Sequence, residues 1–346
     1  MSIGVAILSG GESRRFQKPG YTKKDKALEI VNGKRMIEWV IDTAYKISDK
    51  VAIIVRDEEQ VKLYSNIFSK NYPNIGIIAD LKGFGHSPLV GLATSAKVIE
   101  DDFILILPCD APYVREDVLK LLINKPNGYD VISPLWPDGK VEPLFSIYRR
   151  EHVLLCYEAL LSLKRWRPDD LIRASRKSYL ISVENIREID KELNSFFNIN
   201  YPEEISIKKR IKSNNGIKED RIIHPNRVPI ERIEEVVKTI LTKDLNPNLI
   251  DDLRNSHFWK SVMTLSLCEN FGRKYLELAG RSFEDEANYY MRKELKMLAL
   301  HALLDALSCW KESNDVRNMN RLSKKALNLR KQVSIDFKGK YLNSHT

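Results

Sequence analysis

The chain has 346 residues, of which 43% are hydrophobic and 30% charged, and its formal net charge is +9. This length exceeds the size at which one hydrophobic core usually keeps growing, so two domains are expected. The four cysteines have neither the spacing of a disulfide framework nor that of a metal site, and no segment reaches membrane-spanning length.

The positive charge suits either a nucleic acid or polyanionic small substrates such as nucleotides, and it does not choose between them. The first eight residues are apolar, but they lack the basic flank and the cleavage site of a signal peptide. We therefore expect a cytoplasmic protein without a membrane segment.

Short apolar runs rich in Val and Ile alternate with helical patterns through the first half of the chain. The runs cover residues 4–8, 51–55, 75–79, 103–107 and 129–133, and the helical patterns cover residues 36–47, 58–69, 89–98 and 115–123. This alternation predicts βαβ units and an α/β, Rossmann-like, mostly parallel sheet that is buried on both faces. Two further strands are expected at residues 144–148 and 179–183.

The pattern changes after Pro202, where a basic stretch leads into a polar linker at residues 213–216. No strand of comparable quality follows. Apolar residues at three- and four-residue spacing predict helices over 230–241, 257–279 and 283–311, and we expect Gly280 to end one helix and Ser282 to begin the next. The sequence thus predicts a domain at residues 1–212 and an all-α domain of unknown role at residues 213–346, with a basic helix at 317–340.

A glycine-rich turn follows the first strand. Ser9, Gly10 and Gly11 come directly after it, and basic residues lie just beyond. Glycines at the end of a strand let backbone amides approach a polyanion, and the basic side chains neutralise its phosphates. A bare Gly-Gly is more often an ordinary tight turn, but the residues that follow favour a triphosphate site.

These residues resemble the LAGGxSxRMGxDK signature of the molybdenum cofactor guanylyltransferase family. The matching positions are Leu8, Gly10, Gly11, Ser13, Arg15, Asp25, Lys26 and Leu28. The sequence departs from the signature at Ser9, where alanine is usual, and at Gln17, where glycine is usual, and residues 17–24 are longer than the usual connection. The resemblance implies that Lys26 neutralises the α-phosphate, while Arg15 and the glycine amides hold the β- and γ-phosphates.

Asp110 lies at the carboxyl end of another expected strand, between Pro108-Cys109 and Ala111-Pro112. Ligands of open α/β sheets bind at this edge, and a carboxylate there suits Mg²⁺ that bridges phosphates. A helix N-cap is the alternative interpretation of an aspartate before a helix. The resemblance favours the metal, because Pro-Cys-Asp-x-Pro is the metal-binding position of the family.

Three more segments resemble motifs of the same family. Ser87, Pro88, Leu89 and Gly91 correspond to its G-P-L-x-G base-recognition segment and complete the expected nucleotide site with Leu8, Ser9 and Ser13. Glu142 lies in a Q-P-L-F-x-x-Y-like strand, and Asn198 and Asn200 lie in an N-x-N-x-P-E-like segment; these three are the expected acceptor-binding residues. Basic residues between 164 and 177 fit an acceptor phosphate site or a solvated helix face equally well.

By this resemblance the chain is a nucleotidyltransferase that moves GMP from GTP to molybdopterin, or to the molybdenum cofactor, with Mg²⁺ as its cofactor. Three alternatives stay open: a cytidylyltransferase, a guanylyltransferase for another phosphorylated cofactor precursor, and a non-catalytic nucleotide-binding scaffold. Molybdoenzymes or other cofactor-biosynthesis proteins are candidate partners of the helical part. No nucleic-acid-binding motif is present, which argues against nucleic acid, and the oligomeric state is left open.

Overall fold

The computed structural model describes residues 2–11, 25–125, 128–201, 204 and 216–333, without the side chains of residues 269 and 270. Within these residues one eight-stranded sheet has the order β10-β9-β7-β8-β6-β1-β4-β5. The strands are β1 (Ile3–Leu8), β4 (Val51–Val55), β5 (Gly76–Ala79), β6 (Phe103–Pro108), β7 (Val131–Leu135), β8 (Ser146–Arg149), β9 (Ser178–Ser182) and β10 (Arg221–Ile223). A small hairpin, β2 (Ile30–Val31) with β3 (Lys34–Arg35), stands apart from this sheet.

The sheet is mostly parallel. β5, β4, β1 and β6 run parallel to one another, and so do β7 and β9, whereas β8 lies antiparallel between β6 and β7 and β10 is antiparallel at the edge. The carboxyl ends of the six parallel strands therefore meet at one edge. The expected α/β class is confirmed, and each expected strand agrees with the structure to within two residues at either end.

Two hydrophobic clusters cover the two faces of the sheet, because alternate strand residues point to opposite sides. In β1, Val5 and Ile7 belong to one cluster and Ala6 to the other. The first face is covered by α1 (Met36–Tyr45), α2 (Glu58–Phe68), α4 (Glu116–Ile123) and α7 (Val183–Ile186). The second is covered by α3 (Pro88–Val98), α5 (Arg150–Ser162) and α6 (Asp170–Ala174).

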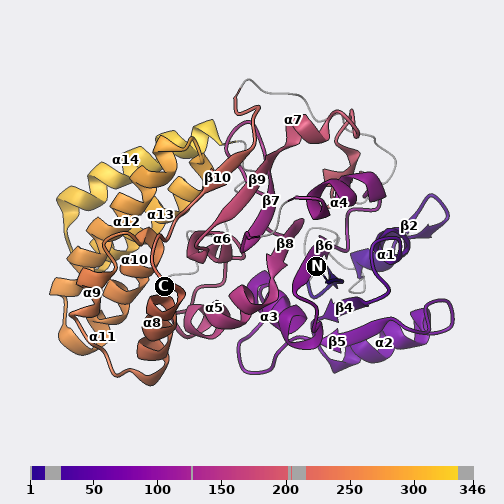
Figure 1. Ribbon diagram of the computed structural model, residues 1–346, viewed down its shortest axis with the longest axis horizontal. Helices are drawn as coiled ribbons and strands as arrows, with labels where there is room; N and C mark the ends of the chain where they lie inside the picture. Colours follow the sequence, from indigo (N-terminus) through magenta and orange to yellow (C-terminus); the bar gives the residue numbers. More distant parts are fainter. Residues whose placement is uncertain (1, 12–24, 126–127, 202–203, 205–215, 334–346) are drawn as a thin grey trace, which may run out of the picture.

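The C-terminal helices extend the cluster of the second face. They are α8 (Ile230–Thr242), α9 (Leu249–Asp252), α10 (His257–Ser266), α11 (Cys268–Phe271), α12 (Lys274–Arg292), α13 (Lys296–Glu312) and α14 (Val316–Gln332). Figure 1 shows them gathered beyond the β10 end of the sheet. Their buried residues, among them Trp259, Phe283 and Leu298, belong to the same cluster as Leu160 of α5 and Leu180 of β9.

Two expectations for this region are wrong. Gly280 and Ser282 do not separate two helices, because both lie inside α12. A Cβ atom at Gly280 would lie 2.8 Å from the ring of Trp310, so this glycine permits close packing of α12 against α13. A strand also follows the linker, where none of comparable quality was expected. This strand, β10, has only three residues, and it is defined by its pairing with β9 and not by a pattern in its own sequence.

A buried group of ion pairs joins α6 to α12 and α13. The Arg173 side chain is fully buried, and its Nε and Nη2 atoms donate to the two carboxylate oxygens of Glu286 at 2.7 and 2.9 Å. Its Nη1 atom donates to Asp170 and to Asp305, each at 2.8 Å. Arg165 also donates to Asp305, at 2.7 Å. The guanidinium groups of both arginines bind carboxylates in this buried interface and do not face an acceptor. The interpretation of residues 164–177 as an acceptor phosphate site is therefore wrong for Arg165 and Arg173.

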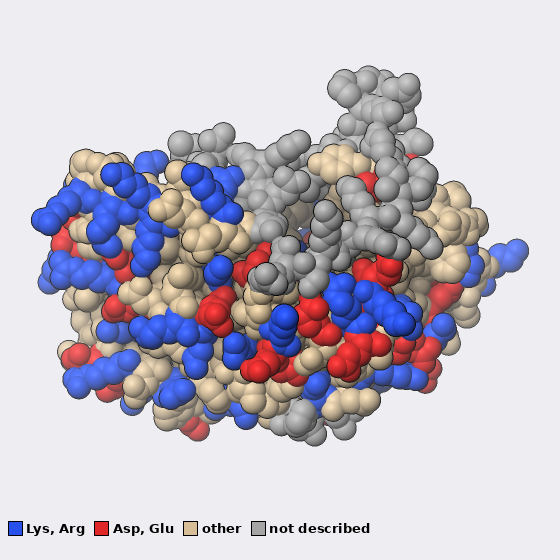
Figure 2. Space-filling view, turned by 90° about the horizontal axis from the view of Figure 1, so that it is seen from above, with Lys and Arg blue, Asp and Glu red and all other residues tan. Residues whose placement is uncertain are grey.

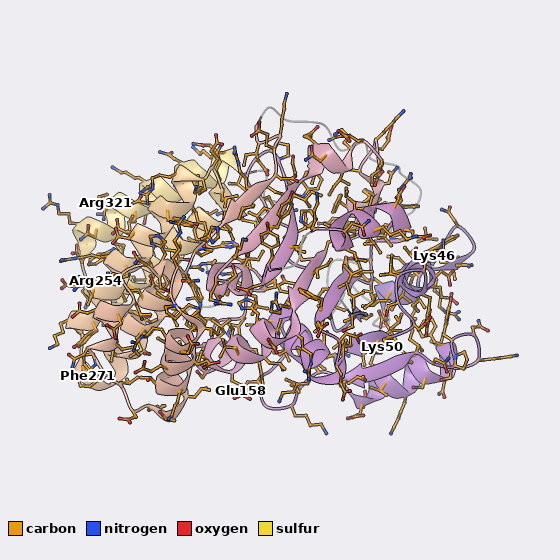
Figure 3. All side chains as sticks on the ribbon, in the orientation of Figure 1. Lys46, Lys50, Glu158, Arg254, Phe271 and Arg321 are labelled. Atoms are coloured by element: carbon orange, nitrogen blue, oxygen red, sulfur yellow. The ribbon has the colours of Figure 1, made fainter. Side chains whose placement is uncertain are left out.

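The last described helix, α14, carries six basic residues and no acidic one. It covers residues 317–332 of the expected basic helix, and residues 334–340 of that expectation lie outside the described residues. Lys and Arg are dense at this end of the molecule (Figure 2), and Arg321 and Arg254 lie at its outer edge, far from Lys46 near the opposite end (Figure 3). Among the described residues, no helix is both long and apolar enough to cross a membrane.

Candidate active site

The glycine-rich turn leaves β1 at the shared carboxyl edge. Ser9 is buried, its amide donates to Ile54 of β4 at 2.8 Å, and its hydroxyl lies 2.7 Å from that of Tyr64. A Cβ atom at Gly10 would lie 3.2 Å from Asp80 Oδ2, which explains why a side chain is disfavoured there. Among the described residues, no atom lies within 4 Å of a Cβ atom placed at Gly11, which suits a backbone that a polyanion approaches. Ser13 and Arg15 lie outside the described residues.

Asp25 is the centre of a hydrogen-bond network below this turn. Its carboxylate accepts from Gln60 Nε2 at 2.6 Å, from the Tyr64 hydroxyl at 2.8 Å and from the Ala27 amide at 3.1 Å. Gln60 also donates to the Ser9 carbonyl oxygen at 3.1 Å. Two residues of α2 thus tie the glycine-rich turn to the short 3₁₀ helix that begins at Lys26.

Lys26 and Asp110 form an ion pair between Nζ and Oδ2, although 84 positions separate them in the chain. Pairing of β1 with β6 brings their segments together, because Leu8 is the register partner of Pro108. Asp110 does not cap α4, whose N-cap residue is Arg115, so the alternative role considered for it is excluded. Burial, helped by the Asp110 charge, raises the pKa of the neighbouring Cys109 thiol to about 12, which leaves it protonated and unsuited to act as a nucleophile.

The segment with the two expected acceptor asparagines lies beside Asp110. The Ile199 amide donates to the carbonyl oxygen of Asp110 at 2.9 Å. Asn200 Nδ2 donates to the carbonyl oxygen of Asn198 at 3.2 Å, and the Asn200 amide donates to Glu204 at 2.8 Å. The structure therefore brings Asn198 and Asn200 to the candidate metal residue.

The expected base-recognition segment forms the start of α3. Ser87 is its N-cap and accepts from the Val90 amide at 3.3 Å, Pro88 begins the helix, and Leu89 is buried in the core. Gly91 is the member that approaches the glycine-rich turn, because a Cβ atom there would lie 3.3 Å from Leu8. Ser87 and Leu89 therefore have structural contacts that account for them without a ligand.

Asp80 is a candidate site residue that sequence reasoning missed. It follows β5 at the shared edge, and its carboxylate is the nearest neighbour of Gly10 and lies 3.7 Å from a Cβ atom placed at Gly91. Burial raises the pKa of Asp80 to about 7, although a hydrogen bond from Thr94 at 3.3 Å acts against this shift. The available signal was positional: Asp80 directly follows a parallel strand, as Ser9 follows β1.

Glu142 lies at the β7 end of the same edge. Its Oε1 atom accepts from Trp136 Nε1 and from Lys140 Nζ, both at 2.6 Å. The Trp136 ring packs edge-on against Phe196 with 5.6 Å between ring centres. Phe196 is two residues before Asn198, so the two expected acceptor segments share this aromatic contact.

A glycine-rich turn, a lysine paired with an aspartate and a buried carboxylate thus converge at the carboxyl edge of a parallel sheet. This fold and this site define a nucleotidyltransferase. The family described as "MobA-like NTP transferase domain" matches residues 5–177, half of the chain, and the chain belongs to this family.

Two curated relatives agree with this assignment, and a solved structure is also similar to this chain. Two proteins called "Probable molybdenum cofactor guanylyltransferase" are each 31% identical to this chain: that of Methanothermobacter thermautotrophicus over 208 residues (59% of this chain, 97% of the relative) and that of Bacillus subtilis over 216 residues (62% and 97%). The crystal structure of molybdopterin-guanine dinucleotide biosynthesis protein A from Archaeoglobus fulgidus is 26% identical, with a TM-score of 0.49, and covers 58% of this chain and 94% of that chain. Almost the whole of each relative thus aligns with about three fifths of this chain.

Proposed function

We propose that the protein transfers GMP from GTP to the phosphate of molybdopterin, or of the molybdenum cofactor, and releases pyrophosphate. A phosphate oxygen of the acceptor attacks the α-phosphorus of GTP, a new P–O bond forms, and the bond to the β-phosphate oxygen breaks. The attacking oxygen is already anionic, so positioning and charge neutralisation matter more than a general base. The names of the relatives support this acceptor and this nucleotide.

The Lys26–Asp110 pair is the observation that carries the proposal. Lys26 is suited to neutralise the α-phosphate as negative charge shifts toward the leaving pyrophosphate. The register of β1 with β6 brings the glycine-rich turn, which follows Leu8, to the same edge of the sheet as Asp110, and this supports a triphosphate that runs from the turn toward the Lys26–Asp110 pair. Both signature residues, Lys26 and Asp110, are intact and in contact, which favours catalysis over the non-catalytic alternative. Arg15 completes the phosphate site in this proposal.

Asp110 is the residue proposed to hold Mg²⁺. Among the described residues no group of three or more His, Cys, Asp or Glu side chains is arranged for a metal ion. This fits Mg²⁺, which keeps several waters and is commonly bound by one or two carboxylates together with substrate phosphates. The ion would neutralise phosphate charge and orient the triphosphate. Asp110 retains a second carboxylate oxygen beyond the one that contacts Lys26.

Asp80 supports guanine over cytosine. Guanine presents N1–H and the N2 amino group side by side, and an ionised carboxylate accepts from both. Cytosine presents its amino group beside the N3 acceptor, which an ionised carboxylate repels. The Asp80 carboxylate lies 3.2 Å from a Cβ atom placed at Gly10 and 3.7 Å from one placed at Gly91, and we propose that the base of a nucleotide bound at the turn contacts it.

The acceptor would occupy the other half of the edge, near Asn198, Asn200 and Glu142. The test is to incubate the protein with Mg²⁺, molybdenum cofactor and each labelled NTP in turn, and to measure pyrophosphate release and the dinucleotide product. GTP should be consumed in preference to the others. Preferential use of CTP would assign the cytidylyl reaction, and GTP use with a different phosphorylated precursor would replace the acceptor.

A further inference from the structure

The turn between β7 and β8 lies against the corner where α12 meets α13. Gly139, at φ +82°, is the closest point of this contact: a Cβ atom there would lie 2.4 Å from the Glu294 carbonyl oxygen, 2.6 Å from the Lys296 amide nitrogen and 3.2 Å from the Leu295 Cα atom. All three neighbours are backbone atoms, so they cannot rotate away. The turn and the helical corner therefore fit together only while position 139 lacks a side chain.

A second C-terminal segment holds the same turn. The Ile217 amide donates to the Pro137 carbonyl oxygen at 3.0 Å, and a Cβ atom at Gly216 would collide with that carbonyl group. The Ile217 and Leu295 side chains are buried in one cluster with Leu135, which is the last residue of β7. Two segments that follow residue 215 thus enclose the turn.

This turn carries Glu142 and the residues that hold it. The Trp136 amide donates to the Lys140 carbonyl oxygen at 2.7 Å, and the Gly139 amide donates to the Trp136 carbonyl oxygen at 2.9 Å, which closes the turn. The side chains of Trp136 and Lys140 both donate to Glu142. A displacement of Gly139 therefore moves the groups that orient the Glu142 carboxylate.

We propose that the α12–α13 corner, residues 293–295, is a positioning element of the acceptor half of the active site. It holds the turn of residues 136–142 so that Glu142 faces the acceptor. In the nucleotide half, Ser9 and Asp80 follow β1 and β5, which other strands separate from β7 in the sheet, and Lys26 begins a short 3₁₀ helix. The inference rests on the proposed function for the identity of the acceptor half. It assigns to the C-terminal helices a part in substrate binding that adds to any docking role.

The experiment compares Gly139→Ala with Gly33→Ala in the full-length protein. Gly33 is a matched control, because it has φ +85° and no atom of the described residues lies within 4 Å of an added Cβ, so it carries the backbone strain without the collision. We expect Gly139→Ala to raise the KM for the molybdenum cofactor by about tenfold or more, since small displacements of positioning groups have effects of this size. The Kd for GTP should change less than twofold, and Gly33→Ala should change neither quantity.

Hydrogen exchange of residues 134–145 gives a second readout that needs no acceptor. Gly139→Ala should speed exchange of the amides at positions 136, 139 and 142, while Gly33→Ala should not.

If Gly139→Ala does not fold, Ile217→Ala loosens the same turn without a collision and should change both readouts in the same direction. Equal acceptor KM values and equal exchange for the Gly139 and Gly33 variants would overturn the inference. If the wild-type protein transfers no nucleotide, the proposed function is overturned. The hydrogen-exchange comparison of the Gly139 and Gly33 variants would still test whether the α12–α13 corner holds the turn.

Discussion

Lys26 and Asp110 are held in contact from two different directions. β6 delivers Asp110 at the carboxyl edge of the sheet, and the Asp25 network with Gln60 and Tyr64 fixes the segment that carries Lys26. In the proposed reaction the two groups have separate roles: Lys26 contacts a phosphate of the nucleotide and Asp110 holds the metal ion. The two groups therefore predict separable effects when each is replaced.

Asp110→Asn should abolish most of the turnover while the fold is kept. The amide has nearly the same volume but loses the charge that a Mg²⁺ ligand supplies, and loss of one such electrostatic contact typically costs about 10²–10³ in rate. The measurement is the steady-state rate as a function of Mg²⁺ concentration. Asp117→Asn makes the same change at an exposed carboxylate that pairs with Arg115, and it should leave the rate unchanged. A wild-type rate in Asp110→Asn would remove Asp110 from the mechanism.

Lys26→Ala should lower kcat more than it weakens GTP binding. A charge that acts mainly on the transition state lowers the rate at saturating substrate, whereas one that binds ground and transition states equally changes only KM. Binding of GTP measured by calorimetry and single-turnover rates separate these effects. Lys34→Ala removes a surface lysine that pairs with Asp42 and serves as the control. Equal losses of affinity and rate would show that Lys26 binds GTP without a specific role in the chemical step.

Most of this site was predictable because its members are local motifs at strand ends. The turn at Gly10 and Gly11, Lys26 and Asp110 each belong to a recognisable pattern, and the strand order then brings them together. Asp80 follows a strand but belongs to no recognised motif, and Tyr64 lies inside a helix, so only the three-dimensional arrangement places them beside Gly10 and Asp25. Arg173 was misjudged for the opposite reason: its sequence neighbourhood is basic, but its partners Glu286 and Asp305 come from distant helices.

Asp80 should make GTP binding depend on pH near neutrality. Its pKa of about 7 reflects burial of the charged form. Guanine needs the ionised carboxylate, so GTP affinity should fall as the pH drops below 7, by at most about tenfold per pH unit for one linked proton. Asp80→Asn should flatten this profile and reduce the preference for GTP over CTP, and it also controls for titration of the nucleotide phosphates. An unchanged profile in Asp80→Asn, measured from pH 6 to 8, would refute base recognition by this residue.

The raised pKa of Asp80 affects stability in the opposite direction: as the pH rises, GTP affinity should increase, whereas the stability of the nucleotide-free protein should decrease. A carboxyl whose pKa is raised on folding favours the protonated folded state, so its contribution is fully present below its ordinary pKa of 3.8 and declines as the pH rises to about 7. Asp80→Asn should therefore stabilise the nucleotide-free protein relative to the wild type above pH 7. This follows because the variant does not bury a charge.

Arg173→Met should destabilise the protein strongly. It leaves the buried Glu286 carboxylate without the arginine that binds both of its oxygens, while Asp170 keeps Arg165, and breaking a buried ion pair in this way typically costs about 3–5 kcal/mol. Denaturant unfolding gives the free energy of unfolding. Lys34→Ala removes a cation from an exposed pair and should show no comparable loss. A small effect of Arg173→Met would mean that the carboxylates become protonated at little cost.

The boundaries of the α/β strands were predictable, whereas those of the C-terminal helices were not. Strands such as β4 are continuous apolar runs bounded by turn residues, which is a local signal. The helix that spans Gly280 depends on Trp310 of α13, against which the glycine packs, and the three residues of β10 depend on β9. Local propensity predicts a helix end at Gly280, because the sequence alone does not show that this glycine packs against Trp310.

The last prediction concerns residues 1–212. From the sequence we expect this part to fold alone and to bind GTP. The division of the chain into domains at residues 1–212 and 213–346 stays a prediction. The structure now argues against independent folding, because the buried core on the second face of the sheet continues into α8–α14, and Arg173 finds Glu286 and Asp305 there. Without residues 213–346 the outer faces of α5 and α6 would be exposed and a buried cation would lose two partners.

The separately expressed 1–212 chain should therefore be aggregated or lack cooperative unfolding, and co-expression with residues 213–346 should recover a stable complex that binds GTP. A chain of residues 1–333 controls for truncation as such. The measurements are size-exclusion chromatography, thermal unfolding and GTP calorimetry on each preparation. If residues 1–212 alone unfold cooperatively near the wild-type temperature and bind GTP with full affinity, the core shared with α8–α14 contributes little to the stability of residues 1–212. The helices would then be a separable domain, and their contact with Gly139 would affect only the acceptor half of the site.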